Sequence, residues 1–231
     1  MQSQKDVDAT PVQCVVSTPT LPFEPYYKDE RCTIYNADSR KVLPWLPKFD
    51  LLLTDPPYGL GEKLRGGKTG MMNGCFNEMV DDGWDTKPQP WQLQMMLESA
   101  EEYIVWGGNY FCESLRGSQC VLVWDKMNGT NPMADCEIAM TSFAKGARMF
   151  SRHHFSAGCG GKVHPTQKPL PLMQWCISVA GEEVKTIVDP FAGGMTTLLA
   201  AKVEGRHAVG IEINEKYCEA GAKRLEQGVL F

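Results

Sequence analysis

Several features that mark particular classes of protein are missing from this chain. No apolar run approaches the roughly 20 residues that cross a membrane as a helix. The first ten residues are polar and charged, unlike the apolar core of a secretory signal. There is no internal repeat and no low-complexity segment. We therefore expect a protein of the cytoplasm, without a membrane partner and without a repeat architecture.

The cysteines lack the spacing of a metal site or a redox pair. There are nine, an odd number, and no two form a C-x-x-C pair. His153, His154 and Cys159 lie close in the chain, but nothing nearby completes a tetrahedral set. We predict no metal, and we interpret the cysteines as reduced, small core residues.

An excess of positive charge is also absent. The formal net charge is −5, which argues against a protein that coats nucleic acid by charge alone. Local basic groups remain in two Gly-rich stretches, and they are candidate nucleic-acid contacts. Their alternative interpretation is solvated loop charge. They are Lys63, Arg65, Lys68, Arg148, Arg152, His153, His154 and Lys162.

The length of 231 residues suits one sizeable domain better than two. Residues 1–25 have little periodicity and are interpreted as a tail, with one domain over 26–231. Within it, strands and helices alternate, which favours a mostly parallel sheet covered on both faces. The predicted strands are 32–37, 49–54, 103–106, 120–124, 138–143, 186–188 and 208–213. The predicted helices are 39–46, one around 93–100, 109–115, 169–180, 195–203 and 214–227. Irregular stretches are expected at 60–85, as a flexible loop, and at 145–163.

A glycine-rich turn follows the strand at 186–188 and has the sequence D-P-F-A-G-G-M-T-T over 189–197. Glycines let a ligand approach the backbone, and the following helix offers unpaired N–H groups. Glu212 closes the next strand, where a carboxylate can accept hydrogen bonds from ribose hydroxyls. The turn is not G-x-G-x-x-G and no basic residue follows it, so a nucleoside without phosphates fits best. A plain tight turn is the alternative.

A second motif, Asp55-Pro56-Pro57-Tyr58, follows the apolar strand at 49–54. Two prolines stiffen the backbone and remove two N–H donors, which leaves carbonyl groups free to accept hydrogen bonds. Asp55 and a carbonyl can grip both N–H groups of an exocyclic amine and free its lone pair for attack. The Tyr58 ring can stack on a base that has left the double helix. An Asp-Pro turn without chemistry is the alternative.

A third motif, H-P-T-Q-K-P over 164–169, opens the helix at 169–180. A helix N-terminus together with Lys168 suits a carboxylate ligand. A capped helix with an incidental lysine is the alternative.

With these three motifs in this order, residues 26–227 resemble the DNA amino-methyltransferases of the beta class. The segment Tyr35-Asn-Ala-Asp38 is similar to another element of that family. The resemblance implies a Rossmann-like class I methyltransferase fold with a seven-stranded, mostly parallel sheet and one antiparallel strand. It also implies a circularly permuted motif order, so the last helix should return to the first strand.

The resemblance implies S-adenosylmethionine as the cofactor. Asp55 and the Pro56 carbonyl, beside Pro57, would hold the target amine, and Tyr58 would stack on the flipped base. The segments 124–126 and 137–143 match weaker family elements that line the base pocket. The implied cofactor-binding residues are Asp38, Asp55, His164, Thr166, Gln167, Lys168, Asp189, Phe191, Ala192, Gly193, Gly194, Thr196, Thr197, Glu212 and Ile213.

The predicted function is methyl transfer to adenine N6 in DNA. In this family Asp at the first position of the D-P-P-Y motif usually goes with adenine, and Ser with cytosine N4. The open alternatives are cytosine N4 methylation, N-methylation of RNA or of a protein amide, a non-catalytic partner subunit, and a nicotinamide-dependent enzyme. The recognition region, near 145–163, is short, so we expect a relaxed site, a homodimer or a second recognition subunit. The resemblance places such a protein in a bacterial cell or a phage-infected host, as part of a restriction-modification system or carried by a phage.

Overall fold

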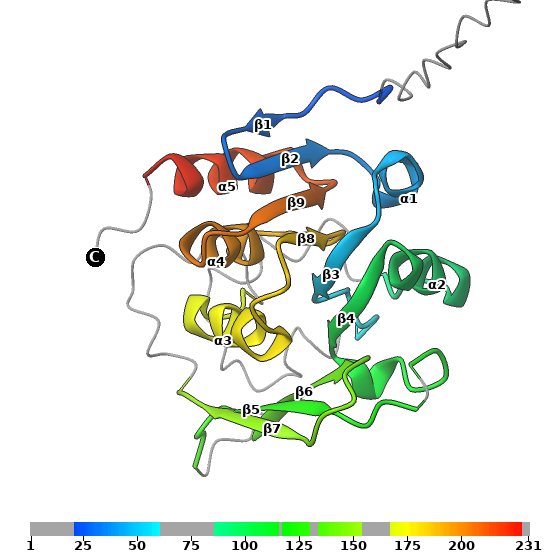
Figure 1. Ribbon diagram of the computed structural model, residues 1–231, viewed down its shortest axis with the longest axis vertical. Helices are drawn as coiled ribbons and strands as arrows, with labels where there is room; N and C mark the ends of the chain where they lie inside the picture. The colour runs from blue at the N-terminus through cyan, green and yellow to red at the C-terminus, as the bar shows by residue number, and fades with distance from the viewer. Residues whose placement is uncertain (1–20, 61–85, 116, 130–133, 154–166, 228–231) are drawn as a thin grey trace, which may run out of the picture.

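The computed structural model describes residues 21–60, 86–115, 117–129, 134–153 and 167–227 (Figure 1). Its described strands form one sheet. They are β1 (Tyr27–Lys28), β2 (Cys32–Asn36), β3 (Phe49–Thr54), β4 (Ala100–Trp106), β5 (Val121–Asp125), β6 (Cys136–Thr141), β7 (Arg148–Ser151), β8 (Thr186–Asp189) and β9 (His207–Glu212). The helices are α1 (Ser39–Val42), η1 (Leu43–Trp45), α2 (Pro90–Glu98), η3 (Gly108–Tyr110), α3 (Leu170–Ala180), α4 (Thr196–Val203) and α5 (Glu215–Gln227).

The strand order of the sheet is β1-β2-β9-β8-β3-β4-β6-β5-β7. All neighbours from β2 to β4 pair in parallel, whereas β6 is antiparallel to both β4 and β5. The run from β2 to β5 is the predicted seven-stranded sheet with one antiparallel strand. Two short strands extend it: β1 pairs antiparallel with β2, and β7 pairs in parallel with β5. The predicted fold class is therefore confirmed.

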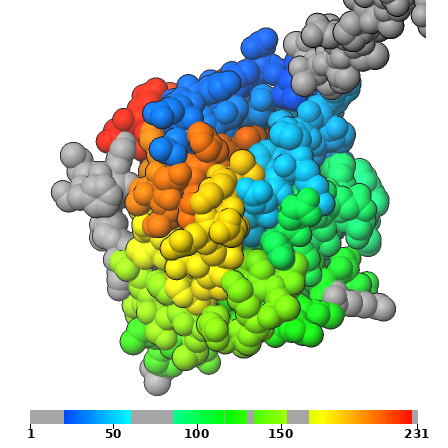
Figure 2. Space-filling view, in the orientation of Figure 1, coloured from blue at the N-terminus to red at the C-terminus, as the bar shows by residue number. Residues whose placement is uncertain are grey.

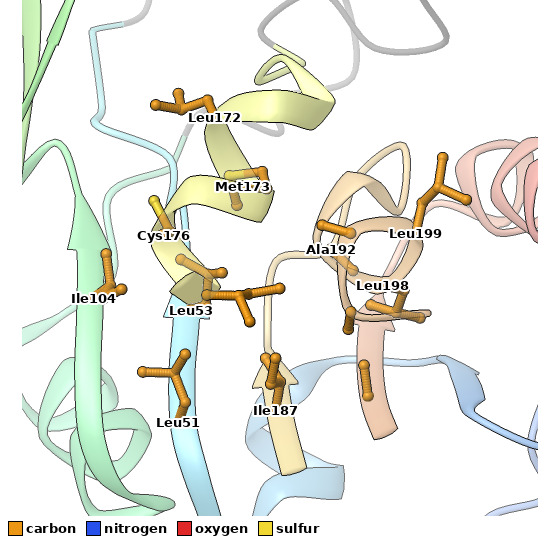
Figure 3. Packing of buried hydrophobic residues seen from close by; sticks show 14 of the residues in the cluster. Leu51, Leu53, Ile104, Leu172, Met173, Cys176, Ile187, Ala192, Leu198 and Leu199 are labelled. Atoms are coloured by element: carbon orange, nitrogen blue, oxygen red, sulfur yellow. The ribbon is translucent and has the colours of Figure 1, made fainter. Parts of the chain in front are cut away.

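Helices cover both faces of the sheet (Figure 1). On one face α3, α4 and α5 pack on alternate residues of the strands, among them Leu51 and Leu53 of β3. On the other face α1, η1 and α2 pack on the remaining residues, such as Leu52. Figure 3 shows Leu51 and Leu53 beside Ile187 of β8 and Cys176 of α3. Consecutive leucines can all be buried because successive side chains of a strand point to opposite faces and both faces are covered.

The two ends of the described chain meet in one part of the sheet. Strand β2 pairs in parallel with β9, with Cys32 opposite Ala208 and Asn36 opposite Glu212. Helix α5 packs against both strands. In Figure 2 the N-terminal segment, in blue, lies directly beside the C-terminal segments, in orange and red. The last helix thus returns to β2, the first strand predicted from the sequence.

Two local predictions were wrong. The segment 109–115 was expected to be a short α-helix, but it holds only the single 3-10 turn η3 followed by turns. Gly107, the residue before η3, has a left-handed backbone (φ +68°), which redirects the chain. The stretch 145–163 was expected to be irregular, but it contains β7. Pairing with β5, which is not local in sequence, makes β7 a strand.

Membrane-spanning helices, metal sites and disulfides can be examined in the described part of the chain. Among those residues no helix is long and apolar enough to cross a membrane. The same residues contain no group of three or more His, Cys, Asp or Glu side chains that could hold a metal ion. The six described cysteines are free thiols, and four of them are buried.

Candidate active site

Two of the predicted motifs lie side by side at the carboxyl ends of β3 and β8. These strands are parallel neighbours, with Leu52 opposite Val188. The Thr54 hydroxyl donates a hydrogen bond of 2.8 Å to Oδ1 of Asp189, which joins the ends of the two strands. The loops that follow therefore open at one edge of the sheet. Open α/β sheets bind their ligands at this edge.

Asp189 holds the glycine-rich loop together from inside. The Thr197 hydroxyl donates to Oδ2 at 2.5 Å, and the Phe191 amide donates to Oδ1 at 3.1 Å. Asp189 is only 3% exposed. Burial raises the pKa of its carboxyl to about 6, although these donors and Thr54 lower it. Asp189, Thr196 and Thr197 were predicted cofactor residues. Their side chains are buried: Thr197 donates to Asp189, and Thr196 accepts from Arg224. Contact of this segment with a cofactor stays a prediction.

Asp55 is held by a tyrosine and a lysine. The Tyr58 hydroxyl donates to Oδ1 of Asp55, and the Lys168 ammonium pairs with Oδ2. Burial raises the pKa of Asp55, and the charge of Lys168 opposes that rise. Asp55 of the motif at 55–58 and Lys168 of the motif at 164–169 thus meet in space.

Lys168 also pairs with a second carboxylate. Its Nζ lies 2.9 Å from Oε2 of Glu137 on β6, and the Lys126 Nζ lies 2.5 Å from Oε1 of the same residue. Burial would raise the pKa of Glu137, but the two ammonium groups outweigh it and lower the pKa to about 2. Four charges of alternating sign therefore run from Lys126 through Glu137 and Lys168 to Asp55. We call them the charge chain.

The Tyr58 ring rests on the turn after β4. The Tyr110 ring stacks on it, with 4.7 Å between ring centroids and 18° between ring planes, and Phe111 meets it edge-on. A Cβ atom on Gly107 would overlap the Tyr58 ring. Sequence reasoning missed Gly107 and Tyr110 as parts of this site. The signal that could have found them is G-G-N-Y directly after a buried strand.

Glu212 lies where the glycine-rich loop meets the end of β9. Its carboxylate accepts hydrogen bonds from the Gly193 amide at 2.9 Å and the Asn214 amide at 2.8 Å. Each oxygen keeps lone-pair capacity for a further donor. Burial raises the pKa of Glu212, and the backbone N–H groups oppose that rise. Ile213, the next residue, is 68% exposed and offers an apolar surface. This arrangement fits a ligand with adjacent hydroxyls and a flat ring.

Other predicted cofactor residues surround the same edge. Asp38 follows β2, the neighbour of β9, and its side chain caps α1 and pairs with Arg40. Gln167 approaches the loop, since a Cβ on Gly194 would lie 3.1 Å from its Oε1. Phe191 is partly buried against the core, and Ala192 is buried in it.

The predicted DNA contacts are only partly visible. Arg148 is an exposed residue of the edge strand β7, and Arg152 and His153 follow that strand. Seven predicted site residues lie outside the described part of the chain: Lys63, Arg65, Lys68, His154, Lys162, His164 and Thr166.

The sequence is similar to those of known DNA methyltransferases. The DNA methylase family matches residues 114–223. Type II methyltransferase M.ScaI of Streptomyces caespitosus is 25% identical over 88% of this chain and 84% of its own length. DNA adenine methyltransferase YhdJ of Escherichia coli K12 is 30% identical over 58% of this chain and 44% of its own length.

Solved structures share the fold. The M1.HpyAVI–SAM complex has a TM-score of 0.59 and 21% identity, covering 84% of this chain and 98% of that one. The cytosine-N4-specific PvuII DNA methyltransferase has a TM-score of 0.59 and 19% identity, covering 88% and 89%. At this identity the likeness concerns the fold. Together with the family match, it confirms the resemblance predicted from the three motifs.

Proposed function

We propose that this chain, a DNA amino-methyltransferase of the N6/N4 class, transfers a methyl group from S-adenosylmethionine to adenine N6 in DNA. The observation that supports it most is the Thr54–Asp189 hydrogen bond. It ties the amine-gripping loop, 55–58, to the glycine-rich loop, 189–194, across neighbouring strand ends. A target amine held by the first loop would then face a cofactor held by the second.

The residues at the sheet edge fit the cofactor. Glu212 would accept hydrogen bonds from the ribose hydroxyls, and Ile213 would cover the adenine ring. Asp38 would accept from the adenine amine. Thr166 would hold the methionine carboxylate beside Lys168, whose ammonium already pairs with Asp55 and Glu137. The bound cofactor supplies a methyl group that its sulfonium has already activated.

The protein's own contribution is orientation and charge. Asp55 and the Pro56 carbonyl would each accept one N–H of the target amine, which turns the nitrogen lone pair toward the methyl group. Positive charge that grows on nitrogen is stabilised by these acceptors, and the proton leaves most easily after transfer. The base must first leave the duplex, at a cost of a few kcal/mol. It would stack on the Tyr58 face opposite Tyr110, or displace Tyr110.

Adenine is favoured over cytosine by the family association of Asp55 and by the relative from E. coli, which is named as an adenine enzyme. The PvuII enzyme, which shares the fold, is named as cytosine-N4-specific, so cytosine N4 is the second candidate. The charge of the site does not separate them, because both amines present the same pair of donors.

The decisive experiment is methylation of unmodified DNA with labelled cofactor, followed by digestion and mass spectrometry of the nucleosides. We expect N6-methyladenine; N4-methylcytosine would support the second candidate. RNA and whole-cell protein serve as competing substrates, and label in either of them alone would contradict the proposal.

Asp55→Ala is the variant that separates catalysis from cofactor binding. We expect it to abolish methylation, because the target amine loses a charged acceptor, while calorimetry still detects cofactor binding. Loss of cofactor affinity in this variant would count against the role given to Asp55.

The partner of the site is DNA, and recognition would involve the sequence region near 145–163, with Arg148 and Arg152. Because that region is short, we propose a short or relaxed recognition sequence, or help from a second copy or subunit. Mapping methylated positions in genomic DNA tests this. A long, strictly read site methylated by the monomer would contradict it. The setting we propose is a bacterial or phage-infected cell.

A further inference from the structure

The charge chain contains one lysine that serves two carboxylates. Lys168 is 7% exposed, and its ammonium lies between Asp55 on the loop after β3 and Glu137 on β6. The same ammonium also donates a hydrogen bond of 3.5 Å to the Tyr58 hydroxyl. The rings of Tyr58 and Trp106 lie 5.9 Å and 5.8 Å from Nζ. Lys168 is therefore enclosed, with little access to water.

In this arrangement both oxygens of Asp55 already accept hydrogen bonds, one from Tyr58 and one from Lys168. An incoming amine would use the remaining lone-pair capacity of an Asp55 oxygen and would draw the carboxylate away from Lys168. A buried ammonium that lost its single partner would be left uncompensated, which is strongly unfavourable. Glu137 removes this obstacle, because Lys168 keeps a paired carboxylate when Asp55 turns to another donor.

Glu137 is itself held in place. Lys126, at the end of β5, grips its other oxygen, and the Lys126 ammonium lies 5.4 Å from the Trp124 ring centre. Lys126 is 8% exposed. Strands β5 and β6 pair with Trp124 opposite Glu137, so the sheet fixes the spacing of this pair. The outer half of the charge chain is thus a rigid support for the inner half.

We propose that Glu137 and Lys126 are positioning residues of the methyl-transfer site. Lys126 anchors Glu137, and Glu137 holds the Lys168 ammonium so that Asp55 can accept the target amine. This inference rests on the proposed function. It adds two residues that touch neither the amine nor the cofactor and act through Lys168.

Other ionisable groups face this cluster and must be considered in any pH experiment. Tyr58 and Glu137 face Asp55, and Asp189 lies across Thr54 from it. The Cys176 thiol of α3 faces Lys168. Burial raises the pKa of Cys176, so this thiol stays protonated near neutral pH. Asp189 is unchanged in every variant used below.

The test compares Glu137→Gln and Lys126→Met with the wild type in single-turnover methylation at saturating cofactor and DNA. We expect each variant to slow methyl transfer by about 100-fold, as for a misplaced catalytic group, with DNA affinity unchanged. Glu101→Gln is the matched control, because Glu101 lies on β4 in an exposed ion pair with Lys48 at 3.0 Å. We expect it to react like the wild type.

The pH profile separates positioning from a merely structural role. Asp55 must be ionised to accept the amine, so activity falls as pH drops through its pKa. In Glu137→Gln a repelling charge is gone and Asp55 alone holds Lys168, so the acid limb should move to lower pH. In Lys126→Met, Glu137 draws Lys168 away from Asp55, so the acid limb should move to higher pH.

A second measurement does not depend on activity. Carbon-13 NMR of proteins with labelled aspartate carboxyls reports the pKa of Asp55 directly, with Asp55→Asn identifying the signal. We expect the same opposite shifts in the two variants. Slow variants with unmoved acid limbs, shifts in one direction only, or variants as fast as the wild type would each overturn the inference. If the wild type methylates no DNA, the proposed function fails, and the NMR shifts then decide only whether Glu137 and Lys126 act on Asp55.

Discussion

Asp55 and Asp189 are two carboxylates at neighbouring strand ends, and their surroundings give them different tasks. Asp55 has a charged partner in Lys168, whereas Asp189 is held by two hydroxyls and one backbone amide. When their surroundings give two neighbouring carboxyl groups different pKa values, the two groups often have different roles. We assign the chemistry to Asp55 and the support of the loop to Asp189.

The raised pKa of Asp189 predicts how stability depends on pH. Because the folded pKa is about 6 and the ordinary value is 3.8, this group stabilises the fold fully below pH 3.8. That contribution, about 3 kcal/mol, is lost as pH rises through 6. Relative to Asp189→Asn, the wild type should lose this much free energy of unfolding over that range, as measured by urea titration.

Asp50 is the control for this experiment. Burial raises its pKa, but donation from the amides of Lys185 and Thr186 prevails and lowers it. Its contribution is present above the ordinary pKa of an aspartate and is lost as pH falls. Asp50→Asn should therefore give a pH trend opposite to that of Asp189→Asn. Equal trends would contradict the assignment.

Tyr58 contributes both a ring and a hydroxyl. Tyr58→Phe keeps the ring but removes the hydrogen bond to Asp55, and we expect about 10-fold slower turnover. Tyr58→Ala also removes the surface on which the base stacks, and should cost about a further 10-fold. Single-turnover rates measure both. Equally severe loss in the two variants would show that the hydroxyl, and not the ring, is what matters.

At the scale of elements, the turn after β4 sets the position of Tyr58. Gly107 adopts φ +68°, where a side chain is strained, and a Cβ there would overlap the Tyr58 ring. Gly107→Ala should therefore lower stability by at least about 1 kcal/mol and also lower turnover, because the ring must move.

Gly146→Ala provides the comparison, because a Cβ at Gly146 meets only the Arg148 guanidinium, at 3.7 Å. We expect it to retain stability and turnover. Thermal unfolding and methylation assays on both variants check this. A Gly107→Ala protein with full activity would show that the turn does not position Tyr58.

Local sequence predicted most elements as helix or strand correctly, but it did not always predict the residues at which they begin and end. The strand β3 was predicted with its exact bounds, since its apolar run ends at the D-P-P-Y motif. The helix at 39–46 became α1 plus a 3-10 turn, with Pro44 inside that turn. The segment 109–115 was predicted to be a short helix, but the left-handed Gly107 redirects the chain and Tyr110 stacks on Tyr58.

For the whole molecule, the arrangement of β2 beside β9 joins the two ends of the described chain into one sheet. We propose that residues 26–231 unfold as one domain. Far-ultraviolet circular dichroism and tryptophan fluorescence should give the same urea midpoint. Of the six tryptophans, Trp106 and Trp124 are buried on β4 and β5, in the half of the sheet away from β2. Different urea midpoints for the two signals would show that the domain unfolds in more than one step.

The sequence alone determined the alternation of strands and helices, the three motifs and their order, because periodicity and turn chemistry are local properties. It also placed Asp55 and Glu212 at strand ends. Only the tertiary structure decided that Lys168 pairs with both Asp55 and Glu137, that Tyr110 stacks on Tyr58, and that β7 is a strand. These features depend on which distant segments become neighbours when the sheet forms. A buried charge is then stable only beside a charge of opposite sign.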